Sequence, residues 1–245
     1  MKIWLEHLAK DLPPTVIFHG YDINDRLFPD PSTLPPNLSF SVFNILEPVS
    51  ESLYEKYDVV HIRGLCMVLK ETEWDGVVKN VSKMIKPGGY IVWTETDPGG
   101  AQSIPPAPTA DKVASILGYM CKIRGGDPYC TAKLPTYLSN NGFTIIPPPT
   151  SPNTNYTPLP PDPASGHYIH IPAKDYHPDT VRPFSRNFVK GLCSFISYMS
   201  QFNVPNEWFT PETAGGFTEQ FIAETDEGGS SVLFDLVCVV GQKLE

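Results

Sequence analysis

Up to residue 146 the chain alternates between short apolar runs and segments whose apolar residues recur at helical spacing. The runs, rich in β-branched and aromatic residues, predict strands at residues 15–21, 38–46, 58–62, 90–93 and 143–146. Helical spacing predicts helices at residues 3–10, 73–85, 111–122 and 131–141, with a short helix at 47–56. Strands and helices that alternate with short connections are typical of βαβ units, so we expect an α/β fold with a parallel sheet.

The later part of the chain is marked by proline. Proline accounts for 27 of the 245 residues, roughly twice the usual share of about 5%. Residues 147–183 are proline-rich, aromatic and irregular, and we interpret them as an insert or lid within a single domain. Beyond them the pattern predicts helices at 184–202 and 216–224 and a closing strand at 231–240.

Composition narrows the classes of protein and of partner. The net charge is −9 and the pI about 5.1, and basic residues do not cluster, so a nucleic-acid partner is not expected. The five cysteines are scattered without a CxxC pair, which indicates free thiols in a reducing compartment. No apolar stretch reaches the ~18 residues of a membrane span. We therefore expect a soluble, cytoplasmic protein with no membrane partner.

Two stretches carry a resemblance to a known family. They are YDVVHIR at residues 57–63 and KNVSKMIKPGGYIVWTETD at residues 79–97. Together they resemble the class I S-adenosylmethionine-dependent methyltransferases, in particular the fungal subgroup around secondary-metabolite clusters that includes regulator-like proteins. The resemblance runs from residue 3 to about 97 and returns weakly at 134–146 and 231–243. It implies a Rossmann-like sheet, with residues 1–100 as the cofactor half.

The sequence departs from that family at its start. In the family, a strand and a glycine-rich loop precede the helix that corresponds to residues 3–10, and glycine lets the backbone approach the cofactor. Without that strand, a gap of two strand spacings, roughly 9–10 Å, would separate its two neighbours. Three outcomes are open: the flanking strands pair directly, another segment or a second copy fills the gap, or a longer chain begins upstream of Met1.

The resemblance assigns site residues at the ends of the predicted strands. Asp22 matches the acidic residue that accepts hydrogen bonds from the ribose hydroxyls of the cofactor, and Asn44 stands near the adenine with Ile45 on its face. The alternatives are a solvated Asp22 and an Asn44 that serves only its own turn. His61 is the candidate catalytic base, or else a histidine that packs at a strand end. Arg63 is assigned to the cofactor site, or else holds an acidic neighbour.

A substrate pocket is expected from Trp93, Glu95 and His177. Glu95 and Asp97 are also candidates for acid–base chemistry or, alternatively, for capping the turn after their strand. His177 lies with His167 and His170 in the proline-rich segment. Their spacing alone does not bring them together, so no metal site is assigned.

The resemblance implies methyl transfer from S-adenosylmethionine to a small, hydrophobic metabolite. Two alternatives remain open because of the departure at the start. The pocket of a pseudo-methyltransferase would serve a cofactor-free cyclisation or isomerisation. A non-catalytic chain would instead pair with an intact relative, and a homodimer is also possible.

Overall fold

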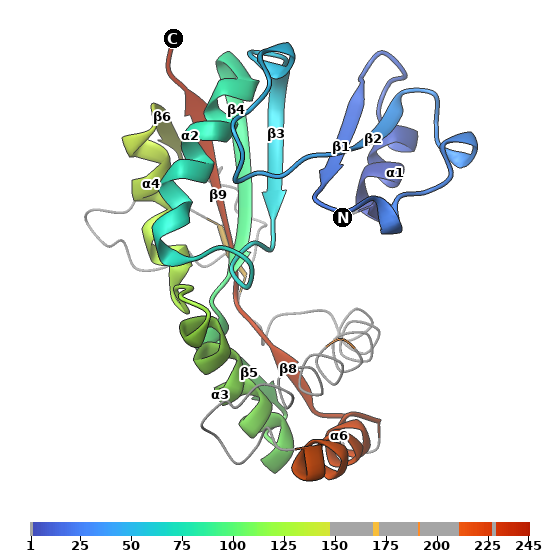
Figure 1. Cartoon of the computed structure of the whole chain (residues 1–245), viewed down its shortest axis with the longest axis vertical. Helices are drawn as coiled ribbons and strands as arrows, with labels where there is room; N and C mark the ends of the chain where they lie inside the picture. Colours follow the sequence, from blue (N-terminus) through green and yellow to red (C-terminus); the bar gives the residue numbers. More distant parts are fainter. Residues whose placement is uncertain (1, 148–168, 172–190, 192–210, 227–228) are drawn as a thin grey trace, which may run out of the picture.

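The computed structural model describes residues 2–147, 169–171, 191, 211–226 and 229–245 (Figure 1). The first unit consists of helix α1 (Lys2–Asp11) and the parallel strands β1 (Phe18–Asp22) and β2 (Leu38–Val42). A Cβ on Gly20 of β1 would lie 3.0 Å from the Leu5 side chain, so α1 packs closely on this strand. The predicted strand at 15–21 thus begins three residues late and extends to Asp22.

The larger sheet has five strands in the described part of the chain. Strand β3 (Tyr57–Arg63) runs parallel to β4 (Ile85–Thr96), and β9 (Leu236–Lys243) runs antiparallel to β4. Strands β6 (Phe143–Ile146) and β7 (Ile169–Ile171) both pair antiparallel with β9. The sheet is therefore mixed, and the expectation of a parallel sheet was wrong for β9, which opposes all its neighbours.

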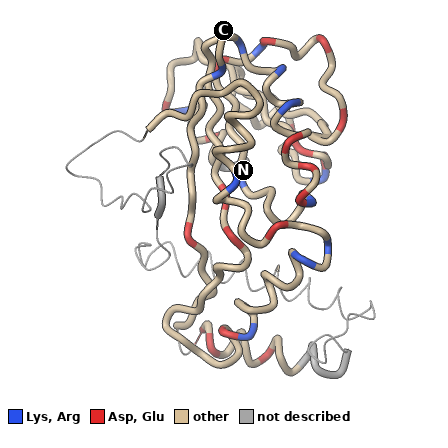
Figure 2. Tube along the Cα trace, turned by 90° about the vertical axis from the view of Figure 1, so that its left-hand side faces the viewer, with Lys and Arg blue, Asp and Glu red and all other residues tan. Residues whose placement is uncertain are grey.

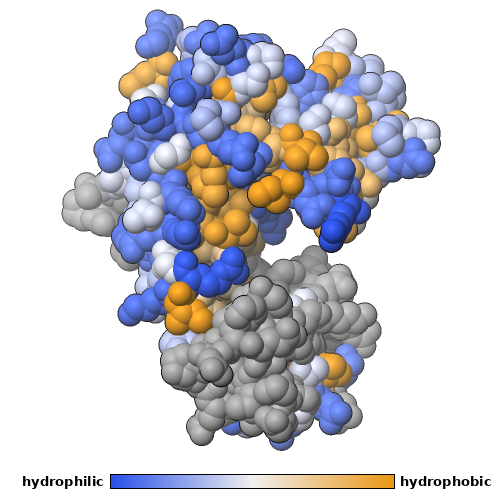
Figure 3. Space-filling model, viewed as in Figure 1, coloured by the Kyte–Doolittle hydropathy of each residue, from blue (hydrophilic) through white to orange (hydrophobic). Residues whose placement is uncertain are grey.

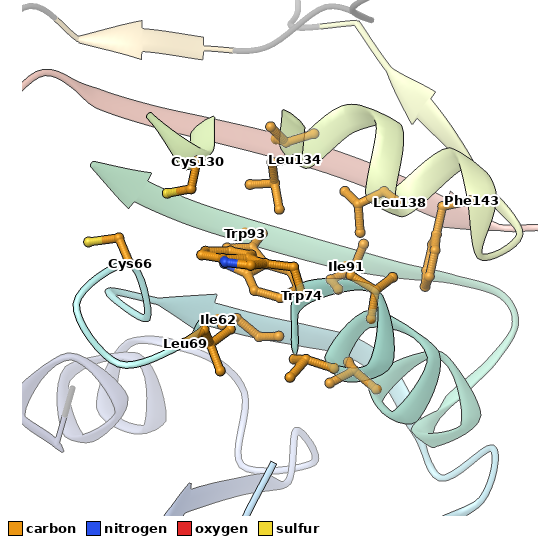
Figure 4. Close-up of a cluster of buried hydrophobic side chains, with 14 of the residues drawn as sticks. Ile62, Cys66, Leu69, Trp74, Ile91, Trp93, Cys130, Leu134, Leu138 and Phe143 are labelled. Carbon is orange, nitrogen blue, oxygen red and sulfur yellow. The ribbon is translucent and has the colours of Figure 1, made fainter. Parts of the chain in front are cut away.

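One face of this sheet carries the main hydrophobic core. Helices α2 (Trp74–Met84) and α4 (Leu134–Asn140) cover that face (Figure 1). The ring of Trp74 stacks on that of Trp93 with centroids 5.7 Å apart, and the buried side chains around them include Ile62, Leu69, Ile91, Leu134, Leu138 and Phe143 (Figure 4). The apolar spacing that predicted a helix at 73–85 is the spacing of its buried face.

The KPGG segment lies within a strand and not in a free turn. Helix α2 ends at Met84, and β4 already begins at Ile85. The register with β3 jumps between Tyr57 and Val59, which is a bulge that takes up the extra residues. Gly88 has a φ of 74°, and a Cβ on Gly89 would lie 2.9 Å from the Asp58 carbonyl oxygen. Both positions therefore require glycine.

A second core lies below the sheet in Figure 1. It is formed by helix α3 (Pro108–Ile123), helix α6 (Pro211–Asp226) and the antiparallel pair β5 (Gln102–Ile104) and β8 (Ser231–Leu233). The Glu224 carboxylate accepts hydrogen bonds from the backbone N–H groups of Thr109 and Ala110, at 3.0 and 2.9 Å. It thereby caps the amino end of α3 from another helix.

Three further predictions are corrected or untested. The helix expected at 47–56 is only a 3-10 turn at Glu51–Leu53. The closing strand expected at 231–240 is two strands, β8 and β9, separated by Phe234 and Asp235. The helix at 184–202 and most of the insert at 147–183 lie outside the described residues. No helix in the described ranges is long and apolar enough to cross a bilayer.

Charged residues are interspersed along the described chain. In Figure 2, Lys and Arg alternate with Asp and Glu along the trace and do not collect on one element. Apolar surface, by contrast, gathers where the first unit adjoins the five-stranded sheet (Figure 3).

Candidate functional site

The carboxyl ends of β1 and β3 lie along the same edge of the two sheets, on the side of the second core (Figure 1). Tyr57, at the start of β3, bonds to His19 and Tyr21 in β1, while His61, near the end of β3, contacts Trp4 in the first turn of α1. Because α1 returns directly into β1, its first turn lies beside the carboxyl end of β1. The two strands therefore run in the same direction, and in open α/β sheets ligands bind at this edge.

Asp22 ends β1 at this edge. Its carboxylate is exposed, and one oxygen accepts a hydrogen bond from the Asn24 backbone N–H at 3.1 Å. A carboxylate offers about four lone-pair sites. Asp22 thus retains capacity for hydroxyl donors, as a ribose would supply.

Asn44 and Ile45 follow β2, the neighbour of β1. The Asn44 side chain accepts from the Leu46 backbone N–H and donates to Glu47, both at 3.1 Å. The Ile45 side chain packs against the main core, and its carbonyl accepts from Asn80 of α2. Asn44 therefore serves its own turn, and contact with a ligand would require it to give up those bonds.

His61 and Arg63 are two residues apart in β3, so their side chains point to the same face of the strand. The Trp4 indole lies on the His61 ring with centroids 4.4 Å apart. Burial lowers the pKa of His61, and the neighbouring Arg63 lowers it further. The imidazole is therefore neutral at neutral pH and can accept a proton, although Trp4 covers one of its faces. Arg63 itself is exposed at the end of the strand.

Trp93 and Glu95 lie inside the core and not on an open surface. Trp93 is 0% exposed and Glu95 1% exposed. Glu95 accepts hydrogen bonds from the backbone N–H groups of Leu65 at 2.7 Å and Cys66 at 3.1 Å, and from the Trp93 indole at 3.0 Å. Burial raises its pKa, and these three donors oppose the shift. The carboxylate fixes the loop after β3 to the end of β4.

Asp97 also makes a structural connection. Its carboxylate accepts hydrogen bonds from the Thr131 backbone N–H at 2.9 Å and from the Thr131 hydroxyl at 2.6 Å. Burial raises its pKa despite these bonds. This geometry matches the turn-capping alternative for Asp97.

The histidines of the proline-rich segment are not placed. His167 and His177 lie outside the described residues, and His170 is described only as part of the backbone of β7. Elsewhere in the described chain no group of three or more His, Cys, Asp and Glu side chains is arranged to hold a metal.

One charged cluster near the same edge was missed by sequence reasoning. Lys133 Nζ lies 2.6 Å from Glu71 Oε1 and 2.7 Å from Asp127 Oδ2. These groups are far apart in the chain, and no local pattern connects them. The cluster joins the loop before α2 to the turn before α4.

The fold is that of the Rossmann-like class I methyltransferases. Phosphoethanolamine N-methyltransferase 2 of Haemonchus contortus, solved with S-adenosylhomocysteine, is similar over 98% of this chain and 46% of its own, with a TM-score of 0.51. The sequences are 11% identical, so this likeness concerns the fold alone.

The curated relatives are fungal methyltransferases and regulators of secondary metabolism. The chain is 39% identical over 102 residues to methyltransferase grgD of a Penicillium species, covering 39% of this chain and 35% of the relative. It is 35% identical over 89 residues to N-methyltransferase tcpN of Claviceps purpurea, covering 36% of this chain and 32% of that relative. The secondary metabolism regulator LAE1 of Hypocrea atroviridis is 25% identical to it over 95 residues, covering 39% of this chain and 26% of the regulator. The match spans between 26% and 35% of the length of these relatives. No family model matches the sequence.

Proposed function

We propose that the chain acts in methyl transfer from S-adenosylmethionine to a small, hydrophobic metabolite of fungal secondary metabolism. The observation that carries the proposal is the 39% identity to a fungal methyltransferase over 102 residues. The strand edge described above supports it, because the exposed Asp22 carboxylate lies where the fold binds ligands.

The residues present fit the ribose of the cofactor better than its adenine. Asp22 would accept hydrogen bonds from the two ribose hydroxyls. Ile45 would pack on the adenine, whereas Asn44 would have to leave its bonds to Leu46 and Glu47. Arg63 would lie at the same edge, beyond the end of β3. Bound S-adenosylmethionine supplies an electrophilic methyl group.

The protein's contribution to such a transfer is mainly positioning. A nucleophile held in line with the methyl group, in a site without bulk water, reacts through proximity and orientation. His61 is our candidate base for the proton that the nucleophile releases, since its lowered pKa keeps the ring neutral. Trp93 and Glu95 would act from inside the core, by holding the loop at Leu65 in place.

Calorimetric titration of the 245-residue chain with S-adenosylmethionine and S-adenosylhomocysteine tests the proposal. We expect dissociation constants in the micromolar range for both. Absence of binding by a folded, monodisperse sample would overturn it, and would leave the cofactor-free cyclisation or isomerisation and the partner protein as alternatives.

One structural observation favours the alternative in which the chain is a non-catalytic partner of an intact methyltransferase. Strands β1 and β3 each have an edge that pairs with no other described strand. Unpaired edges are common sites of association between chains. The native mass of the assembly, alone and mixed with an intact methyltransferase, separates this reading from the enzymatic one.

A further inference from the structure

Strand β2 lies at the outer end of the two-stranded sheet, on the far side of β1 from β3 (Figure 1). In the described part of the chain it pairs with β1 alone, so its other edge has no strand beside it. Edge strands in natural proteins are usually protected by charges, prolines or bulges. β2 contains no proline, its register with β1 is regular, and residues 31–46 around it contain no Asp, Glu, Lys, Arg or His. This edge is therefore open to pairing.

The ladder with β1 determines which backbone groups of β2 point outwards. At the start of the ladder, the Phe18 N–H donates to the Asn37 carbonyl over 2.8 Å. Successive residues of a strand alternate the edge to which their N–H and C=O groups point. The residues that point away from β1 are therefore Leu38, Phe40 and Val42.

Most of these outward groups have no backbone partner. The Leu38 N–H donates to the Pro35 carbonyl over 3.0 Å. The Leu38 carbonyl and both backbone groups of Phe40 and Val42 pair with no backbone group of the described residues. β2 therefore offers two donors, from Phe40 and Val42, and three acceptors along its free edge.

The side chains of β2 are apolar on one face and polar on the other. Phe40 lies on the face covered by α1, beside Gly20, and the side chains of successive residues alternate between the faces. Val42, on the same face as Phe40, is 58% exposed. Ser39 and Ser41 are exposed on the opposite face. Each face is thus uniform in chemistry along the strand.

We propose that β2 pairs antiparallel with β2 of a second copy of this chain, about a two-fold axis at Phe40. The two Phe40 residues would exchange both of their backbone hydrogen bonds, and each Val42 N–H would donate to the Leu38 carbonyl of the other copy. In this register apolar side chains meet apolar ones and serines meet serines, since the pairs are Phe40–Phe40, Leu38–Val42 and Ser39–Ser41. A strand of unrelated sequence would not be matched in this way, whereas a two-fold dimer requires such self-complementarity.

Charge also favours a second copy at this edge. Each chain has a net charge of −9, so two copies repel one another wherever their charged surfaces meet. At β2 they approach through an uncharged strand, and no like charges are opposed across the pair. The two-fold axis reverses the direction of the second strand. The edges that carry Asp22 in the two copies therefore point in opposite directions, and both stay open to ligands.

Sedimentation equilibrium of the 245-residue chain tests the dimer. The contact consists of one short strand from each copy and is small, so we expect a weak dimer with a dissociation constant of about 1–100 μM. The molar mass should rise with concentration from 27.2 kDa towards twice that value. A chain that stays monomeric up to about 1 mM would overturn the proposal.

Two double substitutions on β2 test the register, and they differ only in their pattern of charge. In Ser39→Lys/Ser41→Lys, lysine meets lysine across the pair, and we expect at least tenfold weaker dimerisation. In Ser39→Lys/Ser41→Glu, each lysine meets a glutamate of the other copy, and the dimer should be at least as tight as the native one. The control for charge, Ser115→Lys/Ser139→Lys, alters exposed serines of α3 and α4 and should change the dissociation constant less than twofold.

The comparison of these variants decides between the outcomes. Equal dimerisation of the two β2 variants, or a control as weak as the doubly lysine-substituted β2, would overturn the proposal. Circular dichroism should be unchanged in all three. Hydrogen exchange of the native chain needs no variant, and residues 38–42 should exchange more slowly as the protein is concentrated through the dissociation constant. S-adenosylmethionine is absent throughout, so the result is independent of the proposed methyl transfer.

Discussion

The indole N–H of Trp93 donates to a carboxylate oxygen of Glu95 over 3.0 Å, and both side chains are buried in the same core. The two residues are two positions apart in β4 and point to the same face, so the strand itself sets the spacing of their side chains. Glu95 also binds the backbone of Leu65 and Cys66. A single buried carboxylate thus ties the end of β4 to the loop that follows β3.

Replacement of Glu95 is expected to destabilise the fold. In Glu95→Gln, an amide NH₂ group faces backbone N–H donors that now bind a carboxylate, at a cost of about 1–3 kcal/mol. Glu95→Ala leaves the three donors of Leu65, Cys66 and Trp93 without an acceptor. Its loss of unfolding free energy should therefore exceed that of Glu95→Gln. Urea unfolding measures both, with the exposed Glu219→Gln as a control that changes by less than about 0.5 kcal/mol. A Glu95→Gln protein as stable as the control would contradict the structural role.

His61 is expected to make stability depend on pH between 7 and 5. Burial and, to a smaller extent, Arg63 lower the folded-state pKa of His61 below its ordinary value of 6.5. The folded protein then binds fewer protons than the unfolded chain, so stability falls as the pH drops below 6.5 towards the folded pKa. His19 contributes in the same direction, through burial and Lys56.

Substitution separates the part due to His61. His61→Phe keeps a ring under Trp4 but does not titrate, so its unfolding free energy should fall less between pH 7 and 5 than that of the native protein. The same substitution at the exposed His7 is the matched control for replacing a histidine by phenylalanine. Equal slopes for His61→Phe and the native protein would show that His61 is not the group responsible.

Two helical glycines should respond oppositely to alanine. A Cβ on Gly118 of α3 would lie 2.9 Å from the Gly99 Cα, where backbone meets backbone, so Gly118→Ala should cost about 1–3 kcal/mol. Gly76 of α2 has no atom within 4 Å of such a Cβ, so Gly76→Ala should stabilise by about 0.5–1 kcal/mol through helix propensity alone. The urea midpoint should fall for Gly118→Ala and rise for Gly76→Ala. Midpoints that shift in the same direction would contradict this prediction.

Asp22 is expected to matter for the cofactor if the proposed function holds. Loss of a charge-assisted hydrogen bond in Asp22→Ala should weaken S-adenosylhomocysteine binding by about 1.5–3 kcal/mol, or roughly 10- to 150-fold. Asp11→Ala, at the far end of α1 from Trp4, is the calorimetric control. Unchanged affinity in Asp22→Ala would remove the ribose assignment while leaving the fold class intact.

Local patterns predicted the elements well where one face is buried. The helix around Trp74 and the strand ending at Arg63 were predicted within one residue, because burial imposes the spacing that a sequence displays. The sheet order was not accessible, since β9 pairs with β4, more than a hundred residues earlier in the chain. The role of Glu95 depends on Leu65 and Cys66, some thirty residues away. A carboxylate after a strand has the same local pattern whether it faces a pocket or a buried loop.

The position of β9 has a consequence for synthesis of the protein. This strand lies between β4 and β6, yet it is translated last among the strands. At ~5–20 residues per second, β4 waits roughly 7–30 s on the ribosome for its partner. During that interval the nascent chain presents an unpaired, β-branched strand edge, which is the kind of surface that chaperones cover and that aggregates recruit. A stop codon shortly before residue 236 would make that exposure permanent, so the last ten residues decide whether the sheet can close.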